Sequence, residues 1–224
     1  MKKILYCEDQ FELAEIVTGC LEHSGFQVDY CTNGAEAIKK YRLDKPDILI
    51  LDIVMPELDG FRTAEKIRES DIDTPIIFVT AKTTTEDVVK GFEIGANDYV
   101  KKPYSIEELI VRVNSLLRNR QVPEVKTHQL GKYTFDPSRK KLEISDEIRK
   151  LSYRESELLR KLVESKNEIV KRKDILENLW DGENFFTSRS LDVFVSKLRG
   201  YLKYDKNIKI VNVRNAGYIL LLPD

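Results

Sequence analysis

Five side chains suited to metal and phosphate chemistry lie at the ends of apolar runs in the first half of the chain. Glu8 and Asp9 follow the first run, Asp52 ends the third, Thr80 ends the fourth, and Lys102 follows the fifth. Three carboxylates at one place need a cation, and ligation by oxygen alone suits Mg²⁺. A hydroxyl and an ammonium opposite them would hold phosphoryl oxygens. The set therefore predicts attack by a carboxylate on phosphorus, which gives an acyl phosphate.

Taken singly, each of these residues has an ordinary explanation. An Asp or Glu after a strand is often the N-cap of a helix, and Thr80 could serve as a cap in the same way. The ammonium of Lys102 could be solvated. Because all five stand at strand ends of one predicted sheet, we favour the chemical interpretation.

The apolar runs alternate with segments of helical spacing. Residues 47–51 and 75–80 are apolar at nearly every position, which is typical of strands buried on both faces of a parallel sheet. Five strand-then-helix units predict a doubly wound α/β domain with a five-stranded parallel sheet. The active crevice of such sheets lies beyond the carboxyl ends of the strands. The expected strands are 3–7, 26–31, 47–51, 75–80 and 98–100, and the expected helices are 11–23, 35–42, 60–68, 86–94 and 106–117.

The second half of the chain has a different pattern. Residues 119–127 are polar, contain Pro123 and show no periodicity, which predicts a linker between a domain at 1–118 and one at 128–224. Strands are expected near 130–135, 140–144 and 147–151, helices near 153–165, 171–179 and 188–203, and closing strands at 208–213 and 217–222. Early strands, helices and a terminal hairpin predict an α+β module.

Length and charge agree with two domains of different character. The 224 residues fit two domains of the usual ~100–150 residues each. Residues 1–120 carry 16 Lys and Arg against 22 Asp and Glu, a net charge of −6, whereas residues 121–224 carry 21 against 16, a net charge of +5. This asymmetry suggests that only the second half meets a polyanion, although ordinary surface variation explains it equally well.

Composition disfavours several classes of protein. Cys7, Cys20 and Cys31 are odd in number and lie among apolar neighbours, so we expect small buried thiols rather than a disulfide framework. The two histidines, His23 and His128, argue against a multi-histidine metal site or a Ser-His-Asp triad. The start of the chain lacks a signal-peptide core, and no apolar run approaches the ~20 residues that span a bilayer. We therefore expect a cytoplasmic protein without a membrane partner.

The segments ILYCED, DILILDIVMPELDG, PIIFVTAK and GANDYVKKPY resemble the receiver domain of two-component response regulators, over about residues 2–118. The resemblance implies that Asp52 accepts a phosphoryl group from a sensor histidine kinase, with at most self-catalysed phosphotransfer and autodephosphorylation as enzymatic activity. It also implies that Glu8, Asp9 and Asp52 hold Mg²⁺ together with the backbone carbonyl of Val54.

Other residues of the same resemblance have supporting roles. Lys102 would pair with the phosphoryl oxygens, and its peptide bond to Pro103 is expected to be cis. Thr80 and Tyr99 correspond to the receiver switch pair: the hydroxyl would move to the phosphoryl group, the ring would turn inward, and the surface of residues 86–117 would reshape. The alternative for Tyr99 is a half-buried aromatic without this role. Asp59 with Gly60 is expected to form a turn and a helix start rather than a ligand.

Regulators of the OmpR/PhoB type dimerise through that reshaped face with ion pairs between subunits. The candidates for such pairs here are Lys90, Glu93, Asp98, Glu108 and Arg112. The fit is partial, because a basic position early in helix 86–94 falls on Val88. Surface charges at helical spacing are also common without a special role.

Residues 188–203 could present a cationic helix face to DNA. A buried stripe is predicted by the helical spacing of Leu191, Phe194, Val195, Leu198 and Leu202. The opposite side carries Arg189, Val193, Ser196, Lys197, Arg199 and Lys203. Arg and Lys can reach guanine acceptors or phosphates, and an apolar side chain can touch a thymine methyl. A solvated helix face is the simpler alternative.

The run RSLDVFVSKLR, followed later by VRNAGY, resembles the winged-helix domain of OmpR/PhoB regulators from about residue 129 onward. Leu151 and residues 152–180 also match. The resemblance implies a recognition helix that starts at Arg189, and a loop at 181–187 that contacts RNA polymerase. The implied phosphate contacts are Arg189 and Arg199, the base contacts are Val193, Ser196 and Lys197, and Arg214 at the hairpin tip would enter the minor groove. Ser190, Lys203, Trp180 and Tyr218 complete the candidate DNA contacts, although Trp180 and Tyr218 could be purely core residues.

Three positions depart from this family pattern. Asn215 stands where Gly is usual, and Phe194 stands where His or Tyr is frequent. Gly200 lies inside the predicted helix, where it costs ~1 kcal/mol relative to Ala.

These observations predict a response regulator whose phosphorylation at Asp52 favours a homodimer that binds double-stranded promoter DNA. Linked receivers would raise the effective concentration of the second DNA-binding domain. An aspartyl-phosphate hydrolase would also use Asp52 with Mg²⁺, but Val54 replaces the second acid that such an enzyme needs, and no cap domain is evident. A DNA-binding protein whose receiver no longer switches is the third alternative.

Overall fold

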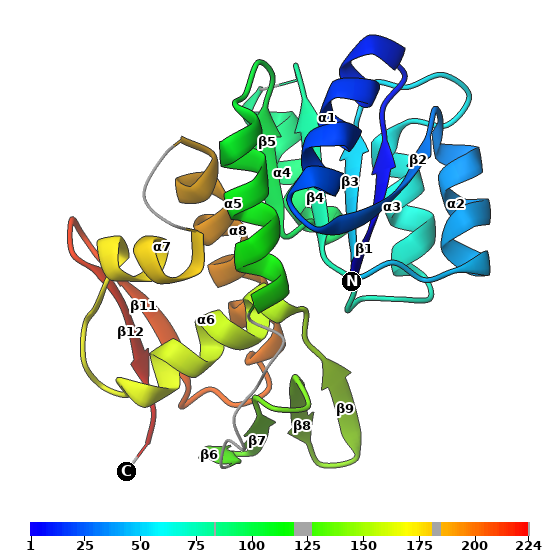
Figure 1. Ribbon diagram of the computed structural model, residues 1–224. Helices are drawn as coiled ribbons and strands as arrows, with labels where there is room; N and C mark the ends of the chain where they lie inside the picture. Colours follow the sequence, from blue (N-terminus) through cyan, green and yellow to red (C-terminus); the bar gives the residue numbers. More distant parts are fainter. Residues whose placement is uncertain (83, 119–126, 181–184, 224) are drawn as a thin grey trace. The chain divides into compact units, whose positions relative to one another are not determined.

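The protein is described by a computed structural model over residues 1–82, 84–118, 127–180 and 185–223. The chain divides into two compact units, residues 1–121 and 122–224, which are treated separately (Figure 1). Most of the linker predicted at 119–127 lies outside the described residues. None of the described helices combines the length and the apolar character that a membrane span requires.

The first unit is a five-stranded parallel sheet in the order β2-β1-β3-β4-β5, with helices on both faces (Figure 1). The strands are β1 (Lys2–Cys7), β2 (Phe26–Cys31), β3 (Ile48–Asp52), β4 (Ile76–Thr80) and β5 (Asp98–Lys101). The helices are α1 (Phe11–His23), α2 (Gly34–Leu43), α3 (Gly60–Arg68), α4 (Thr85–Ile94) and α5 (Ile106–Arg118). The predicted doubly wound α/β fold is confirmed.

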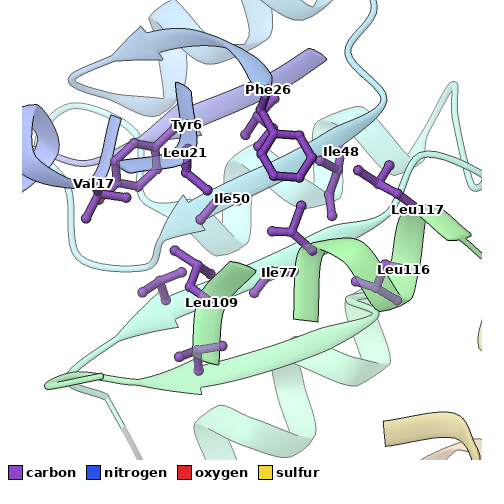
Figure 2. Packing of buried hydrophobic residues seen from close by; sticks show 14 of the residues in the cluster. Tyr6, Val17, Leu21, Phe26, Ile48, Ile50, Ile77, Leu109, Leu116 and Leu117 are labelled. Atoms are coloured by element: carbon purple, nitrogen blue, oxygen red, sulfur yellow. The ribbon is translucent and has the colours of Figure 1, made fainter. Parts of the chain in front are cut away.

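The core of this unit has two layers because side chains of a strand alternate between the faces of the sheet. On one face, residues such as Tyr6 and Ile50 pack against α1 and α5, which contribute Leu21 and Leu109 (Figure 2). On the other face, the ring of Phe78 meets the rings of Phe61 and Tyr99 at centroid distances of 5.2 and 6.1 Å. Strands β3 and β4 are buried at every position, as their apolar runs predict.

Local capping sets where the helices begin. The side chains of Asn33 and Asp59 accept hydrogen bonds from backbone amides at 2.9 and 2.8 Å, one at the start of α2 and one at the start of α3. Such caps satisfy amides that have no partner inside the helix. The prediction that Asp59 starts a helix is confirmed, and α3 therefore begins close behind the carboxyl end of β3.

The cysteines depart from the prediction. Cys7 and Cys31 are paired in register on β1 and β2 and form a disulfide with their Cα atoms 4.8 Å apart, whereas Cys20 is a free thiol. The expectation of buried thiols is wrong for this pair, although both residues are buried. The reason is the parallel register of the two strands, which places residues far apart in sequence directly opposite each other.

We expect the bond between Cys7 and Cys31 to contribute to stability. A disulfide restricts the unfolded chain and typically adds about 2–4 kcal/mol to the free energy of unfolding. Urea denaturation should show a loss of about this size when the wild type is reduced, and no effect of reductant on Cys31→Ala. Cys20→Ala is the matched control and should keep the response to reductant. A wild type whose unfolding ignores reductant would contradict the expectation.

The second unit combines two antiparallel sheets with a group of helices. The first sheet has the order β6-β7-β8-β9, and the second has the order β10-β12-β11. The strands are β6 (His128–Leu130), β7 (Tyr133–Asp136), β8 (Lys141–Ile144), β9 (Glu147–Lys150), β10 (Val170–Lys171), β11 (Lys209–Val213) and β12 (Gly217–Leu221). The helices are α6 (Tyr153–Glu164), α7 (Arg172–Trp180) and α8 (Phe185–Tyr201).

The α+β architecture of this unit is confirmed, with differences in detail. The strand expected at 130–135 is two strands, β6 and β7, because the chain turns at Gly131, whose φ is 54°. The short strand β10 was not predicted, since two residues carry no periodicity. Helix α8 begins at Phe185, three residues before the expected start.

Candidate functional site

An acidic cluster lies at the carboxyl edge of the parallel sheet. Glu8, Asp9 and Asp52 each offer a carboxylate oxygen, and these oxygens lie within 4.8 Å of one another. They meet there because β1 and β3 are adjacent and pair Cys7 with Leu51, so the residues after each strand end at the same edge. Glu8 is fully buried, Asp52 is 4% exposed, and Asp9 is exposed.

Lys102 provides the cation opposite this cluster. Its Nζ donates to Oε2 of Glu8 at 2.5 Å and to Oδ2 of Asp52 at 2.6 Å. Burial lowers the pKa of Lys102, but the hydrogen bonds to Asp52 and Glu8 outweigh it and leave that pKa raised. Burial raises the pKa of Glu8, and the bond to Lys102 opposes the change. The peptide bond between Lys102 and Pro103 is cis, as expected.

The donor set of this edge fits a divalent cation held by oxygen ligands. Three carboxylates against one ammonium leave an excess of negative charge, and an exposed carboxylate such as Asp9 can be reached from solvent. The backbone amide of Val54 donates to Oδ1 of Asp52 at 3.0 Å, which holds that carboxylate in place. The ligand role of the Val54 carbonyl stays a prediction.

Helix α8 divides into the two sides that its sequence predicts. The predicted stripe of Leu191, Phe194, Val195 and Leu198 is buried, and so is Leu202, which follows the end of the helix. The other side exposes Arg189, Ser196 and Arg199, with Val193 partly exposed, and Lys203 beyond the helix end is exposed as well. Two cationic side chains of α8, Arg199 and Lys197, contact other groups within the unit. Nε of Arg199 donates to the Ile210 carbonyl at 2.9 Å, and Nζ of Lys197 lies 3.7 Å from Oε1 of Glu155.

A basic groove lies beside the terminal hairpin of β11 and β12. Its volume is about 890 Å³, and its cationic lining residues are Lys171, Arg172, Lys173 and Arg214. The sequence analysis missed the cations at 171–173. They lie at the end of β10 and the start of α7, and they become neighbours of Arg214 only through the pairing of β10 with β12. At the hairpin tip Asn215 has a φ of 58°, a conformation that Asn tolerates better than most residues, so it can stand where Gly is usual.

Both units match known families. Residues 4–114 match the response regulator receiver domain, and residues 146–220 match the C-terminal domain of transcriptional regulatory proteins. The transcriptional regulatory protein RprY of Bacteroides fragilis is 39% identical over 225 residues, covering 99% of this chain and 95% of that protein. The chain belongs to the OmpR/PhoB family of response regulators. Its receiver domain implies a histidine kinase as partner, and its C-terminal domain implies DNA.

Solved structures agree with this assignment. A mutant of RitR is similar with a TM-score of 0.73 and 26% identity, covering 98% of this chain and 99% of that one. The response regulator DrrB, described as an OmpR/PhoB homologue from Thermotoga maritima, has a TM-score of 0.52 and 25% identity over 99% of both chains. The regulator is thus a phosphorylated transcription regulator rather than a classical enzyme, which argues against the aspartyl-phosphate hydrolase.

The predicted switch pair of the response regulator meets at the backbone of one residue. The amide of Lys82 donates to Oγ1 of Thr80 at 3.1 Å, and the hydroxyl of Tyr99 donates to the Lys82 carbonyl at 2.6 Å. Thr80 and Tyr99 are both buried, so the Tyr99 ring already lies inside the unit in this structure, and the alternative of an aromatic without a switch role stays open. A side chain at Gly91 would approach the Tyr99 ring to 3.3 Å, so the glycine leaves room for it. Movement of the pair on phosphorylation stays a prediction.

Three of the five residues predicted for the dimer face, Asp98, Glu108 and Arg112, form ion pairs within the chain. Arg112 binds Asp98 at 3.0 Å and Glu108 at 2.8 Å, and Asp98 is buried. Lys90 is exposed and lies 4.8 Å from the centroid of the Phe61 ring, and Glu93 is exposed as well. A dimer that uses Asp98 or Arg112 would have to exchange these internal pairs for pairs between subunits.

Three of the predicted DNA contacts are buried. Ser190, Trp180 and Tyr218 are 0%, 2% and 2% exposed, so in this conformation their side chains have almost no surface to offer to DNA. Trp180 packs against Phe194 at a centroid distance of 5.8 Å, and this contact explains why an aromatic occupies position 194. Trp180 and Tyr218 are core residues, the alternative that the sequence left open. The loop expected to meet RNA polymerase lies largely outside the described residues.

Close packing beneath Asp52 makes Gly60 sensitive to substitution. A Cβ there would lie 2.2 Å from the Asp52 carbonyl oxygen and 2.9 Å from Cα of Ile53, so the backbone would have to shift. We expect Gly60→Ala to lower the free energy of unfolding by about 1–3 kcal/mol. Gly19, inside α1, is the matched control, because a Cβ there would meet nothing within 4 Å. Gly19→Ala should raise stability by about 0.5–1 kcal/mol in the same urea titration, and equal effects of the two would contradict the packing argument.

Proposed function

We propose that Asp52 is the phosphoacceptor of this response regulator. The observation that carries the proposal is the Lys102 ammonium, which lies 2.5 Å from Glu8 and 2.6 Å from Asp52, with Asp9 in the same cluster. A carboxylate oxygen of Asp52 would attack the phosphorus of a phosphohistidine. The new bond is oxygen to phosphorus, the bond from nitrogen to phosphorus breaks, and its electron pair stays on the imidazole.

The neighbours of Asp52 would support this transfer. Glu8, Asp9 and Asp52, with the Val54 carbonyl, would hold Mg²⁺, which supplies positive charge to the phosphoryl oxygens when bound. Lys102 would leave its present carboxylate partners and pair with a phosphoryl oxygen, and the Thr80 hydroxyl would donate to another. Thr80 and Tyr99 both form hydrogen bonds to the backbone of Lys82, so movement of one side chain would shift a hydrogen-bond partner of the other.

Phosphorylation would then favour a homodimer that binds promoter DNA. We propose that the face of α4, β5 and α5 forms the dimer contact, and that the exposed side of α8 with the hairpin tip at Arg214 forms the DNA surface. Arg189 and Ser196 on α8, and Lys203 just after it, support this assignment by their exposure, and Val193 is partly exposed. RNA polymerase is proposed as a further partner, through residues 181–187.

The metal site can be tested through Asp9, which is exposed and so should tolerate substitution. Asp9→Asn removes one ligand charge, and we expect the Kd for Mg²⁺ to rise at least about tenfold in isothermal titration calorimetry. The unfolding of the metal-free protein should be unchanged. Asp146→Asn, an exposed acidic residue in the turn after β8, is the matched control and should leave the Kd as it is. Equal Mg²⁺ affinity in Asp9→Asn and wild type would exclude Asp9 as a ligand.

The proposed route from Asp52 to a dimer can be tested by sedimentation velocity. The full chain would be run in Mg²⁺ with and without beryllofluoride, a phosphoryl mimic, with Asp52→Asn as control. We expect wild type alone to shift from monomer to dimer, since only it offers the acceptor carboxylate. A wild type that stays monomeric with bound mimic would show that this dimer face is wrong. Equal DNA affinity with and without mimic would instead support a receiver that no longer switches.

A further inference from the structure

Three polar side chains from different elements of the second unit meet in a closed hydrogen-bonded triangle. Nη1 of Arg172, the first residue of α7, donates to Oδ1 of Asp192 on α8 at 2.9 Å and to the hydroxyl of Tyr218 on β12 at 2.8 Å. The Tyr218 hydroxyl in turn donates to Oδ1 of Asp192 at 2.9 Å. The triangle therefore joins the helix and the hairpin that are proposed to bind DNA.

Arg172 reaches both of these elements a second time. Its Nη2 donates to the Ser188 carbonyl at 2.8 Å, one residue before Arg189. Its backbone amide donates to the Ala216 carbonyl at 2.9 Å, two residues beyond Arg214. A Cβ on the intervening Gly217 would lie 2.0 Å from the Val170 carbonyl oxygen, so β10 and the hairpin are in close contact. One arginine thus bridges the start of the exposed helix face and the base of the hairpin tip.

The triangle also offsets an unfavourable charge. Asp192 is an acidic residue on a helix face proposed to meet phosphates, and 49% of its side chain is exposed. An unpaired carboxylate there would repel DNA, but the guanidinium of Arg172 balances its negative charge. The pair is not deeply buried, since 30% of the arginine side chain is exposed. Burial and the hydrogen bond to Asp192 raise the pKa of Tyr218 to about 12, so the hydroxyl keeps the proton that it donates.

We infer that Arg172, Asp192 and Tyr218 are positioning residues that fix the hairpin relative to α8, so that both elements engage DNA as one rigid surface. The inference rests on the proposed DNA surface and goes beyond it. It gives Tyr218 a role through its hydroxyl, although that side chain is buried. Rigidity favours binding because an element that is already held in its binding geometry loses less conformational entropy when DNA binds.

A double-mutant cycle with Arg214 tests this coupling. The probe is a 25-bp duplex enriched from a random-sequence library by the full-length wild type with Mg²⁺ and beryllofluoride, and Kd is measured by fluorescence anisotropy. In the wild-type background, we expect Arg214→Ala to raise the Kd for the duplex about tenfold. In the Tyr218→Phe background, the same substitution should raise the Kd only about two- to threefold, because a loosened hairpin positions Arg214 less well for binding. Asp192→Asn should reduce the Arg214 effect in the same way.

Tyr133→Phe is the matched control. The Tyr133 hydroxyl also makes two hydrogen bonds inside the unit, donating to the Tyr201 carbonyl at 2.8 Å and accepting from the Tyr204 amide at 3.1 Å. Its loss should affect stability in a similar way and leave the Arg214 effect at about tenfold. Hydrogen exchange of the amides at 213–217 gives a second readout, which should speed up in Tyr218→Phe and not in Tyr133→Phe.

The outcomes separate this inference from the proposed function. If wild type binds no duplex, the proposed DNA surface fails and the inference fails with it. If wild type binds and Arg214→Ala costs the same in all backgrounds, with unchanged exchange at 213–217, the positioning role alone is wrong. A reduced Arg214 effect in Asp192→Asn without one in Tyr218→Phe would indicate that the carboxylate contacts a base directly, and would also overturn the inference.

Discussion

The repulsion among three carboxylates is the constraint on which the first unit depends. Glu8, Asp9 and Asp52 converge within 4.8 Å, and Glu8 has no access to solvent, so the edge of the sheet must hold positive charge. In this structure the ammonium of Lys102 supplies part of it through two short hydrogen bonds. An added cation or phosphoryl group would change that balance of charge.

A chain of hydrogen bonds leads from the neighbouring strand ends to the face of α4 and β5. Thr80 ends β4, and its hydroxyl is bonded to the amide of Lys82 rather than to the acidic cluster. The carbonyl of Lys82 accepts from Tyr99, whose ring packs against Phe78 and Phe92. Charge at the sheet edge is thereby connected, through one peptide segment, to aromatic packing under α4 and β5.

In the second unit, the orientation of α8 depends on the burial of its apolar stripe. The stripe fixes the rotation of the helix about its axis and so decides which residues face outward. The triangle of Arg172, Asp192 and Tyr218 then sets the hairpin against that helix. Trp180 and Tyr218 are large aromatic residues of this interior, and both are buried.

The sequence by itself determined the order of the elements, the doubly wound sheet and the identity of the acidic cluster, because each follows from local periodicity and from the rule that parallel strands end at one edge. Only the tertiary structure decided the contacts that depend on register and on side-chain direction. The register of β1 and β2 made a disulfide of Cys7 and Cys31. The fold also buried Tyr218 and placed Arg172 against Asp192, since helical spacing cannot tell which distant element will cover a residue.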